Sequence, residues 1–457
     1  MRDGFRIAAP PPDTHGLSAG SASMSRHFGL FLATAGLVLT AIWIRPEPMV
    51  LYGTDAACYA QIAKEMAERP LAAWPSITWY GQAFYEHPPL AFWVESLFFR
   101  AFGVSPDSAI ALARLYATAV AVLVGWVGLR LAGPLSGIAA LFALVTLSGF
   151  LYESQNPMLE LPLTLCVLLG VAGLTVERRW LGSLLFAVGV ASAWFVKGPP
   201  ALALAPMLVW AHWRWHRNRR FTLLAASSAV LLLGAAIATF EIARAARGEP
   251  SFFLTYFNRQ VLASSLEGRS RAAPIYYFLP VLWRWYPVAC LMLPVALWTA
   301  RRDPRARPLI ELGALWCLVF LVGFSLPAQK HPWYIHPVVA GCAWLMAPGL
   351  AHAARALGAT GQRHLTWAVG ALAAAVILLV WVRPDAMRAR RPEIEALHAL
   401  PEPRFAPNQR RRVADCGELS IWKTKHLMAF LWDAQRVDCD APAPLRFDGT
   451  RLTPTPR

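Results

Sequence analysis

The stretch GQAFYEHPPLAFW, from Gly81 to Trp93, sets a carboxylate and two prolines into an otherwise apolar and aromatic run. Glu86 and His87 stand directly before Pro88 and Pro89. An ionisable group in or beside a membrane is costly and usually has a functional role. Proline is tolerated in the first turn of a helix, so the run predicts a polar corner followed by a helix that starts near Pro88.

The composition on either side of this corner is that of a membrane protein. Of the 457 residues, 56% are apolar and only 15% are charged, whereas soluble domains have about 25% charged residues. A bilayer core needs about 20 apolar residues per helix. Scanning at that length predicts an all-α polytopic membrane protein with about eleven transmembrane helices, near residues 28–45, 108–130, 134–151, 157–175, 180–196, 199–213, 222–243, 276–300, 309–326, 336–352 and 365–383.

The placement of arginine sets the orientation. With the N-terminus in the cytoplasm, the cytoplasmic connections carry thirteen arginines against two acids, Glu177 and Asp303, which obeys the positive-inside rule. The arginines are Arg130, Arg178, Arg179, Arg214, Arg217, Arg219, Arg220, Arg301, Arg302, Arg305, Arg307, Arg355 and Arg363. This asymmetry accounts for much of the formal net charge of +16, so we expect no nucleic-acid partner.

The same orientation organises the chain around one membrane domain. Residues 1–27 are rich in Pro, Gly and Ser and are expected to be a disordered cytoplasmic N-terminus. The membrane domain follows over 28–383, and its first apolar run is expected to be a retained anchor rather than a cleaved signal peptide. Within it, the first loop at 46–107 and a second loop at 246–275 are expected on the outer face.

The C-terminal segment 384–457 is polar and rich in Pro and Arg. It is long enough for a small outer domain. Cys416 and Cys439 would there lie in an oxidising compartment, where they either form a disulfide or remain two unpaired thiols.

The first outer loop contains two predicted helices. Thr54 or Asp55 can cap a helix over 56–68. Its apolar residues recur at three- and four-residue spacing and its charged residues fall largely on the other face, which is typical of a helix in the membrane interface. These faces comprise Tyr59, Ile62, Ala63 and Met66 on one side and Lys64, Glu65 and Glu68 on the other. The second helix follows the two prolines, so Asp55 and Glu86 are expected at the membrane edge.

Several motifs follow one another along roughly residues 28–345. They are Asp55, YAQIAKEM (59–66), Trp74, Gly81, YEHPPLAFW (85–93), NPMLELPLTL (156–165), KGPPA (197–201) and FSLPAQKHPWYIHP (324–337). This order resembles that of the bacterial type C glycosyltransferases. That family includes the lipid A aminoarabinose transferases and is related to the protein O-mannosyltransferases. No single motif is specific, whereas their order and spacing are.

The resemblance implies an enzyme of the bacterial inner (plasma) membrane with a periplasmic active site. It would move a sugar from a polyprenyl-phosphate donor to a lipid A or other cell-envelope acceptor. Such a reaction needs a base or an electrostatic partner that activates or orients the acceptor. It also needs cations that stabilise the charge on the leaving phosphate. We expect three catalytic carboxylates, Asp55, Glu86 and Glu160. The expected phosphate-binding cations are Lys197, Lys330, Arg259, Arg269 and Arg271, and the other expected pocket residues are Tyr59, Tyr85, His87 and Tyr334.

Each of these residues has a structural alternative. Asp55 also suits a helix N-cap, Glu86 a solvated loop, and Lys197 a side chain that snorkels to the interface. A structural role for Glu160 would require a buried partner. The loop 246–275 is either solvated or a mobile lid whose arginines grip a phosphate.

Two positions depart from the family pattern. His87 stands where the family usually has Lys, and a histidine is only partly protonated at neutral pH. Glu160 stands where the family usually has Asp, which changes its reach by about one methylene. The carboxylates leave a divalent metal at Glu86 and Glu160 open, although nothing in the sequence requires a cofactor.

A membrane transporter or lipid flippase without transferase activity is the alternative function. Such a protein would also have many spans and buried charges, but it would place its acids near the membrane centre on broken helices. The expected acids and cations lie instead at outer joints: Asp55, Glu86, Lys197 and Lys330.

Overall fold

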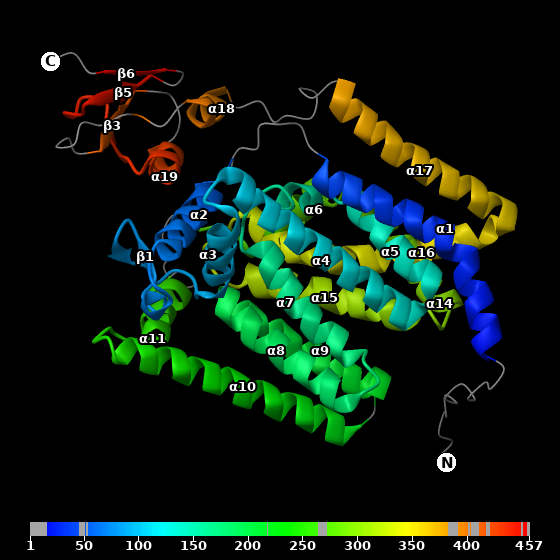
Figure 1. The fold of residues 1–457 in the computed structure, drawn as a ribbon. Coiled ribbons are helices and arrows are strands. Elements are labelled where there is room, and N and C mark those ends of the chain that lie inside the picture. The colour runs from blue at the N-terminus through cyan, green and yellow to red at the C-terminus, as the bar shows by residue number, and fades with distance from the viewer. Residues whose placement is uncertain are drawn as a thin grey trace.

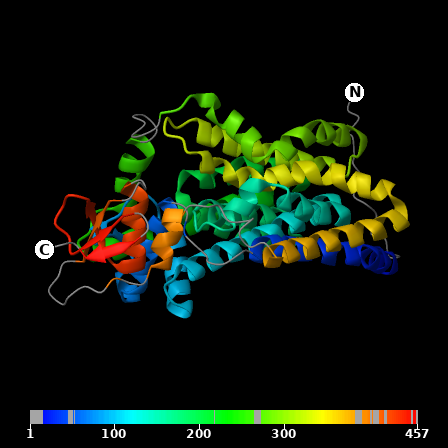
Figure 2. The same ribbon diagram turned by 90° about the horizontal axis from the view of Figure 1, so that it is seen from above.

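The computed structural model describes residues 16–44, 51, 54–216, 218–263, 272–382, 392–400, 403, 411–416, 421–448 and 451–454. These residues form a bundle of long helices with a small sheet at one end (Figure 1). Seen from above, the sheet lies beside the first-loop helices, while the start of the first long helix lies toward the opposite end (Figure 2). The first loop therefore lies at the end of the bundle that carries the sheet.

Helices that satisfy the length and apolarity of a membrane span make up most of the bundle. Five do so among the described residues, namely α4 (Pro106–Ala132), α8 (Arg179–Lys197), α10 (Arg219–Ala245), α15 (Arg307–Ser325) and the unit Pro332–Ala356, which comprises η6 (Pro332–Val338) and α16 (Val339–Ala356). Shorter apolar segments lie in α1 (Gly16–Trp43), α5 (Pro134–Val145) and α7 (Glu160–Leu174). The expected polytopic membrane architecture is therefore confirmed in its coarse form, as a mostly helical protein with a small sheet region rather than an all-α one.

Every expected span is at least partly helical, but three of them are broken. The run 276–300 comprises η5 (Ile275–Tyr277) and α13 (Phe278–Trp285), then α14 (Pro287–Arg302), with a bend of 95°. Pro287 has no N–H to continue the preceding helix. The run 199–213 is divided into η2 (Pro199–Ala203), α9 (Leu204–Ala211) and the π-helical turn η3 (His212–His216), and α6 (Ser148–Glu153) follows α5. The last apolar helix is α17 (Gly358–Val382).

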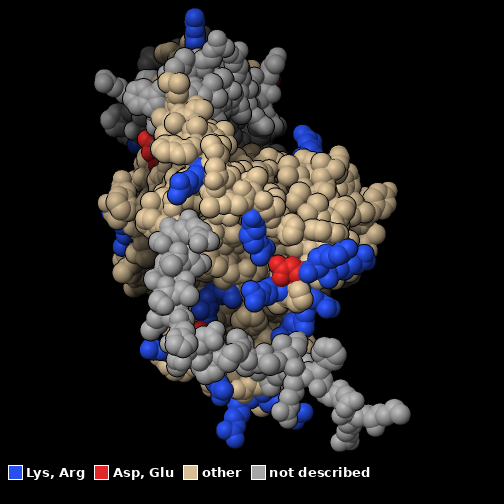
Figure 3. Space-filling model, turned by 90° about the vertical axis from the view of Figure 1, so that its right-hand side faces the viewer, with Lys and Arg blue, Asp and Glu red and all other residues tan. Residues whose placement is uncertain are grey.

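The N-terminal helix starts earlier than the sequence predicted. α1 begins at Gly16, inside the segment 1–27 that we expected to be disordered, whereas residues 1–15 lie outside the described residues. At the end of the bundle that faces the viewer in Figure 3, Lys and Arg outnumber Asp and Glu. That distribution agrees with the positive-inside orientation.

Glycines bring α7 and α8 into close contact. A Cβ added at Gly189 would lie 2.5 Å from the backbone nitrogen of Gly170, so α8 does not tolerate a side chain at this crossing. Small residues allow such close approach of membrane helices. The packing brings the start of α7, at Glu160, to the end of α8, at Lys197.

The first loop contains the two expected helices and a hairpin that the sequence did not reveal. The helices are α2 (Thr54–Ala67) and α3 (Leu90–Phe102). Between them lie η1 (Leu71–Ala73) and the antiparallel strands β1 (Thr78–Trp79) and β2 (Gln82–Ala83). Tyr80 and Gly81 both have positive φ, as a tight two-residue hairpin turn requires. The Glu65 carboxylate accepts hydrogen bonds from both turn amides, at 2.6 and 3.2 Å.

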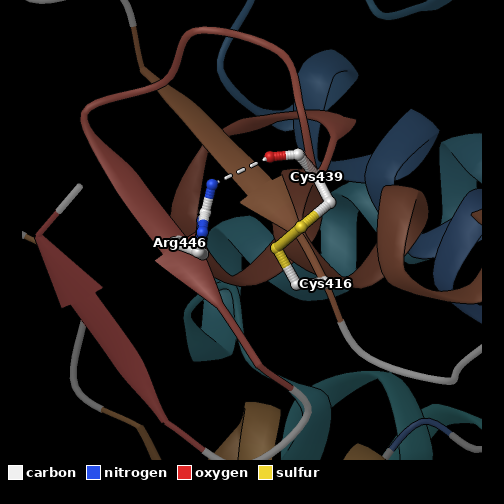
Figure 4. The surroundings of a disulfide bond; sticks show 3 residues. All are labelled: Cys416, Cys439 and Arg446. Atoms are coloured by element: carbon white, nitrogen blue, oxygen red, sulfur yellow. Dashed lines mark hydrogen bonds between the residues drawn. A yellow bond between two sulfur atoms is a disulfide. The ribbon is translucent and has the colours of Figure 1, made fainter. Parts of the chain in front are cut away.

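The C-terminal segment forms a small α/β unit. It contains α18 (Pro392–Ala399), β3 (Arg412–Asp415), α19 (Ile421–Trp432), β4 (Gln435–Asp438), β5 (Leu445–Phe447) and β6 (Leu452–Pro454). The strand order is β4-β3-β5-β6, with β3 parallel to both neighbours and β6 antiparallel to β5. Cys416 and Cys439 form a disulfide, which decides between the two alternatives that the sequence left open (Figure 4).

This unit packs against α2 and covers Lys64 on its charged side. Lys64 is buried, and its Nζ lies 2.7 Å from Asp433 Oδ1 and 3.0 Å from Phe430 O. Lys64, on the charged side of α2, is therefore covered by this unit, while the position of α2 in the membrane interface stays a prediction. α19 packs against α2 because it supplies apolar residues to the same core, including Leu427, Met428 and Phe430.

Candidate functional site

A buried ion pair marks the centre of the candidate site. Glu160 is the first residue of α7 and Lys197 is the last residue of α8, and their side chains are paired although they are only 2% and 9% exposed. Lys197 Nζ also lies 4.4 Å from the centroid of the Tyr334 ring, which a cation–π contact allows. Three of the residues predicted from the sequence therefore lie together, and Glu160 has the buried partner that its position requires.

Asp55 belongs to the same electrostatic environment. It lies in the first turn of α2 and is partly buried. Burial raises its pKa to about 6; the charges of Glu160 and Glu86 add to this rise, and that of Lys197 opposes it. A carboxylate with this pKa is largely ionised at neutral pH and close to the range in which it can accept a proton.

The Glu86–His87 corner presents one exposed and one buried side chain. Glu86 is exposed, and its charge contributes to the raised pKa of Asp55. His87 is buried, with its Nε2 3.1 Å from Tyr59 Oη. Burial, and then the charge of Lys197, lower its pKa to about 3. The imidazole is therefore neutral at physiological pH and does not replace the lysine cation of the family pattern.

The structure does not place the other predicted phosphate-binding cations that it describes in contact with the Glu160–Lys197 ion pair. Lys330 is buried and donates to Ala273 O at 2.9 Å and Pro327 O at 2.6 Å, so it ties together two loop segments. Arg259 is exposed on η4 (Phe257–Leu262), the π-helical turn after α11 (Phe252–Tyr256). Arg269 and Arg271 lie outside the described residues.

Sequence reasoning missed a second polar cluster next to the ion pair. Glu153 at the end of α6 lies 3.4 Å from His336 Nε2, and His336 Nδ1 lies 2.7 Å from Tyr286 Oη. All three side chains are buried. Glu153 is an acid at the end of an apolar run, the same signal that identified Glu160, and it could have been found on that ground.

Two further residues, Tyr256 and Arg244, were also missed by sequence reasoning. Tyr256 Oη donates to the carbonyl of Lys197 at 3.0 Å. Arg244, at the end of α10, donates to Tyr85 Oη at 3.2 Å and is almost completely buried. The sequence contains no local motif that reports such contacts, because the partners are far apart along the chain.

Known proteins similar to this chain were found at both the sequence and the structure level. The chain is 27% identical, over 373 residues, to the undecaprenyl phosphate-alpha-4-amino-4-deoxy-L-arabinose arabinosyl transferase of Yersinia enterocolitica, covering 77% of this chain and 66% of that protein. It is 27% identical, over 351 residues, to the protein of the same name from Pseudomonas aeruginosa, covering 72% of this chain and 62% of that protein. The chain thus spans less than two thirds of the length of these relatives. No family model matches it.

The solved structures decide the architecture. ArnT from Cupriavidus metallidurans bound to undecaprenyl phosphate superposes with a TM-score of 0.66 at 17% identity, covering 90% of this chain and 85% of that one. The archaeal oligosaccharyltransferase of Archaeoglobus fulgidus superposes with a TM-score of 0.58 at 13% identity, covering 92% and 65%. The chain has an ArnT-like fold. The family resemblance drawn from the sequence motifs is confirmed.

A metal ion does not fit the ArnT-like site as the described residues form it. Among those residues, no group of three or more His, Cys, Asp or Glu side chains is placed to hold a metal ion. Glu160 is instead paired with Lys197, whose positive charge occupies the position that a cation would take. We therefore derive no catalytic step through a metal at Glu86 and Glu160.

Proposed function

We propose that this ArnT-like chain is a glycosyltransferase that uses a sugar linked to a polyprenyl phosphate. The donor class is undecaprenyl phosphate carrying an aminoarabinose-type sugar, and the acceptor is lipid A or another cell-envelope lipid or glycan. The observation that carries the proposal is the convergence of Asp55, Glu160, Lys197 and Tyr334 in one site of an ArnT-like fold. The names of the relatives support the donor and acceptor classes.

In the proposed reaction, an acceptor oxygen bonds to the anomeric carbon of the sugar. The bond from that carbon to the phosphate oxygen breaks, and the polyprenyl phosphate leaves with the electron pair. Lys197 would stabilise the charge on this phosphate, and Asp55 would take the proton from an acceptor hydroxyl, or orient an acceptor phosphate that has none to lose. The exposed Glu86 would orient the acceptor.

The ion pair between Glu160 and Lys197 would hold the ammonium ready for the donor. A buried ammonium is costly without a counter-ion, so Glu160 would keep Lys197 charged before the donor binds. On donor binding, the phosphate would share Lys197 with Glu160. The neutral His87 and the rings of Tyr59, Tyr85 and Tyr334 would line the pocket around the sugar.

The proposal includes a topology with eleven spans in the bacterial inner membrane. The N-terminus would be cytoplasmic, and the first loop, the loop 246–275 and the C-terminal unit 384–457 would face the periplasm. The arginine asymmetry of the connections supports this orientation. A lipid-linked donor would reach the site from the surrounding bilayer.

The test compares lipid A and envelope glycans by mass spectrometry in a knockout strain complemented with wild-type protein or with Asp55→Asn. A sugar that wild type restores and Asp55→Asn does not restore supports the proposal and identifies the acceptor. Full restoration by Asp55→Asn would remove Asp55 from the mechanism. A transporter or flippase is distinguished with purified protein in nanodiscs, because only a transferase makes product from donor and acceptor without other enzymes.

A further inference from the structure

A buried arginine at the end of α10 joins the two outer loops. The Arg244 side chain is only 2% exposed. Its guanidinium donates to Pro75 O at 2.7 Å and Tyr85 Oη at 3.2 Å in the first loop, and to Pro250 O at 3.2 Å in the second. Glu249 balances the charge at 2.9 Å. Because the donors of a guanidinium form a rigid planar fork, one side chain holds segments of both loops in a fixed relation.

Aromatic rings extend this contact toward Lys197. The Arg244 guanidinium lies 5.4 Å from the Tyr85 ring centroid and 5.6 Å from that of Phe252, the first residue of α11. Phe252 stacks on Tyr256 with the ring centroids 6.1 Å apart, and Tyr256 holds the Lys197 carbonyl. A continuous series of contacts therefore runs from Tyr85, the neighbour of Glu86 in the chain, to Lys197.

The start of α11 is fixed independently to α10. The backbone amides of Phe252 and Phe253 donate to the Glu241 carboxylate at 3.1 and 2.8 Å. Glu241 lies about one helical turn before Arg244 on α10. The end of α10 thus sets the position of α11 through Glu241 and the position of the first loop through Arg244.

We infer that Arg244 is a positioning residue for the proposed transfer, which sets the Glu86–His87 corner relative to Lys197 through Tyr85 and α11. This role rests on the proposed function, since it requires the acceptor-side carboxylates and the donor-side lysine to act together. Catalysis by orientation tolerates little displacement: a misplacement of about 1 Å can reduce the rate about 100-fold. A lysine at this position would keep the positive charge but would lack the planar set of donors that contacts both loops.

The experiment uses full-length protein in lipid nanodiscs and compares Arg244→Lys with Arg247→Lys. Arg247 is a matched control because it binds earlier residues of the same loop, at Ala72 O (3.1 Å) and Ser76 Oγ (3.0 Å). With rates normalised to folded protein, Arg244→Lys is expected to lower kcat about 100-fold with little change in the donor KM, whereas Arg247→Lys keeps kcat within about threefold. Equal effects of the two variants would overturn the inference.

A double-mutant cycle tests the path through Tyr85. Tyr85→Phe removes only the hydroxyl, so it preserves packing, and the double variant with Arg244→Lys is expected to be no slower than Arg244→Lys alone. Independent, multiplying effects would contradict the path. Hydrogen exchange gives a readout without activity: the segment 78–87 should exchange faster in Arg244→Lys, and unchanged exchange there would also overturn the inference. Faster exchange in a protein that makes no product even as wild type would overturn only the proposed function.

Discussion

Lys197 and Glu160 form a buried ion pair where the end of α8 meets the start of α7. The pair uses Glu160 Oε1, while Oε2 has no hydrogen-bond partner among the described residues. Buried polar atoms are nearly always paired. The second oxygen therefore offers a free acceptor beside the ammonium, where a sugar hydroxyl of the donor would fit.

Removing one partner of this pair should cost both stability and activity. Glu160→Gln leaves the Lys197 charge uncompensated, and breaking a buried pair in this way typically costs about 3–5 kcal/mol. The double variant Glu160→Gln/Lys197→Met removes both charges, so we expect it to recover stability but not activity. Unfolding in detergent and transfer rates in nanodiscs measure the two effects. A double variant that regains activity would show that the pair is only structural.

The rate should rise with pH through the pKa of Asp55. That pKa is raised to about 6, so Asp55 becomes protonated and inactive as a base when the pH falls below this value. We expect kcat/KM to lose about tenfold per pH unit below 6. Because the charge of Lys197 lowers this pKa, the residual activity of Lys197→Met should show the same limb displaced to higher pH. If the acid side of the pH profile is unchanged in this variant, the charge of Lys197 does not act on the pKa of Asp55.

Gly198 should be intolerant of a side chain because of Tyr256. Its φ is +70°, and an added Cβ would lie 2.6 Å from Tyr256 Oη. Gly198→Ala is therefore expected to displace the Lys197 turn and to lower kcat at least about tenfold. Gly358→Ala is the matched control, because Gly358 also has a positive φ but has open space around it. Equal activity of the two alanine variants would rule out a role for this contact.

His87 should act as a neutral residue. Its pKa is lowered to about 3, so it carries no charge above about pH 4 and adds no step to the pH profile there. His87→Gln keeps a neutral polar group near Tyr59 and is expected to retain activity within about threefold. His87→Lys introduces a buried ammonium near Lys197 and should lower the Tm by more than about 3 °C. A faster enzyme with an unchanged Tm for His87→Lys would contradict this assignment.

The disulfide should stabilise the C-terminal unit. Cys416 and Cys439 are 23 residues apart, and closing a loop of this size contributes about 3 kcal/mol. Reduction should therefore lower the unfolding temperature of this unit in wild type. The variant Cys416→Ser/Cys439→Ser provides the control, since its unfolding should not respond to the reductant. Identical unfolding of oxidised and reduced wild type would refute the contribution.

The sequence could predict those features of the fold that depend on local composition. Apolar length and arginine placement predicted the helical membrane architecture, because a bilayer requires the same of every span. The charged residues that stand out in apolar surroundings, such as Glu160 and Lys197, were found for the same reason. Periodicity also located α2 and α3, since the proline residues and the spacing of apolar residues act within single helices.

Only the tertiary structure revealed which side chains meet. The sequence could not show that α19 covers Lys64 of α2, because the two elements lie more than 300 residues apart in the chain. Lys330 looked like a ligand for phosphate, but its ammonium is used by two loop carbonyls. Arg244 and Tyr256 stand in no recognisable motif.

The sequence by itself thus determined which segments form long apolar helices, because that property depends on the residues of one helix. Tertiary structure decided the pairing of charges, the neutral state of His87 and the link from Tyr85 to Lys197. The physical reason is that an electrostatic or hydrogen-bonded partner acts within a few ångströms in space, and spatial neighbours in this fold come from separate helices and loops.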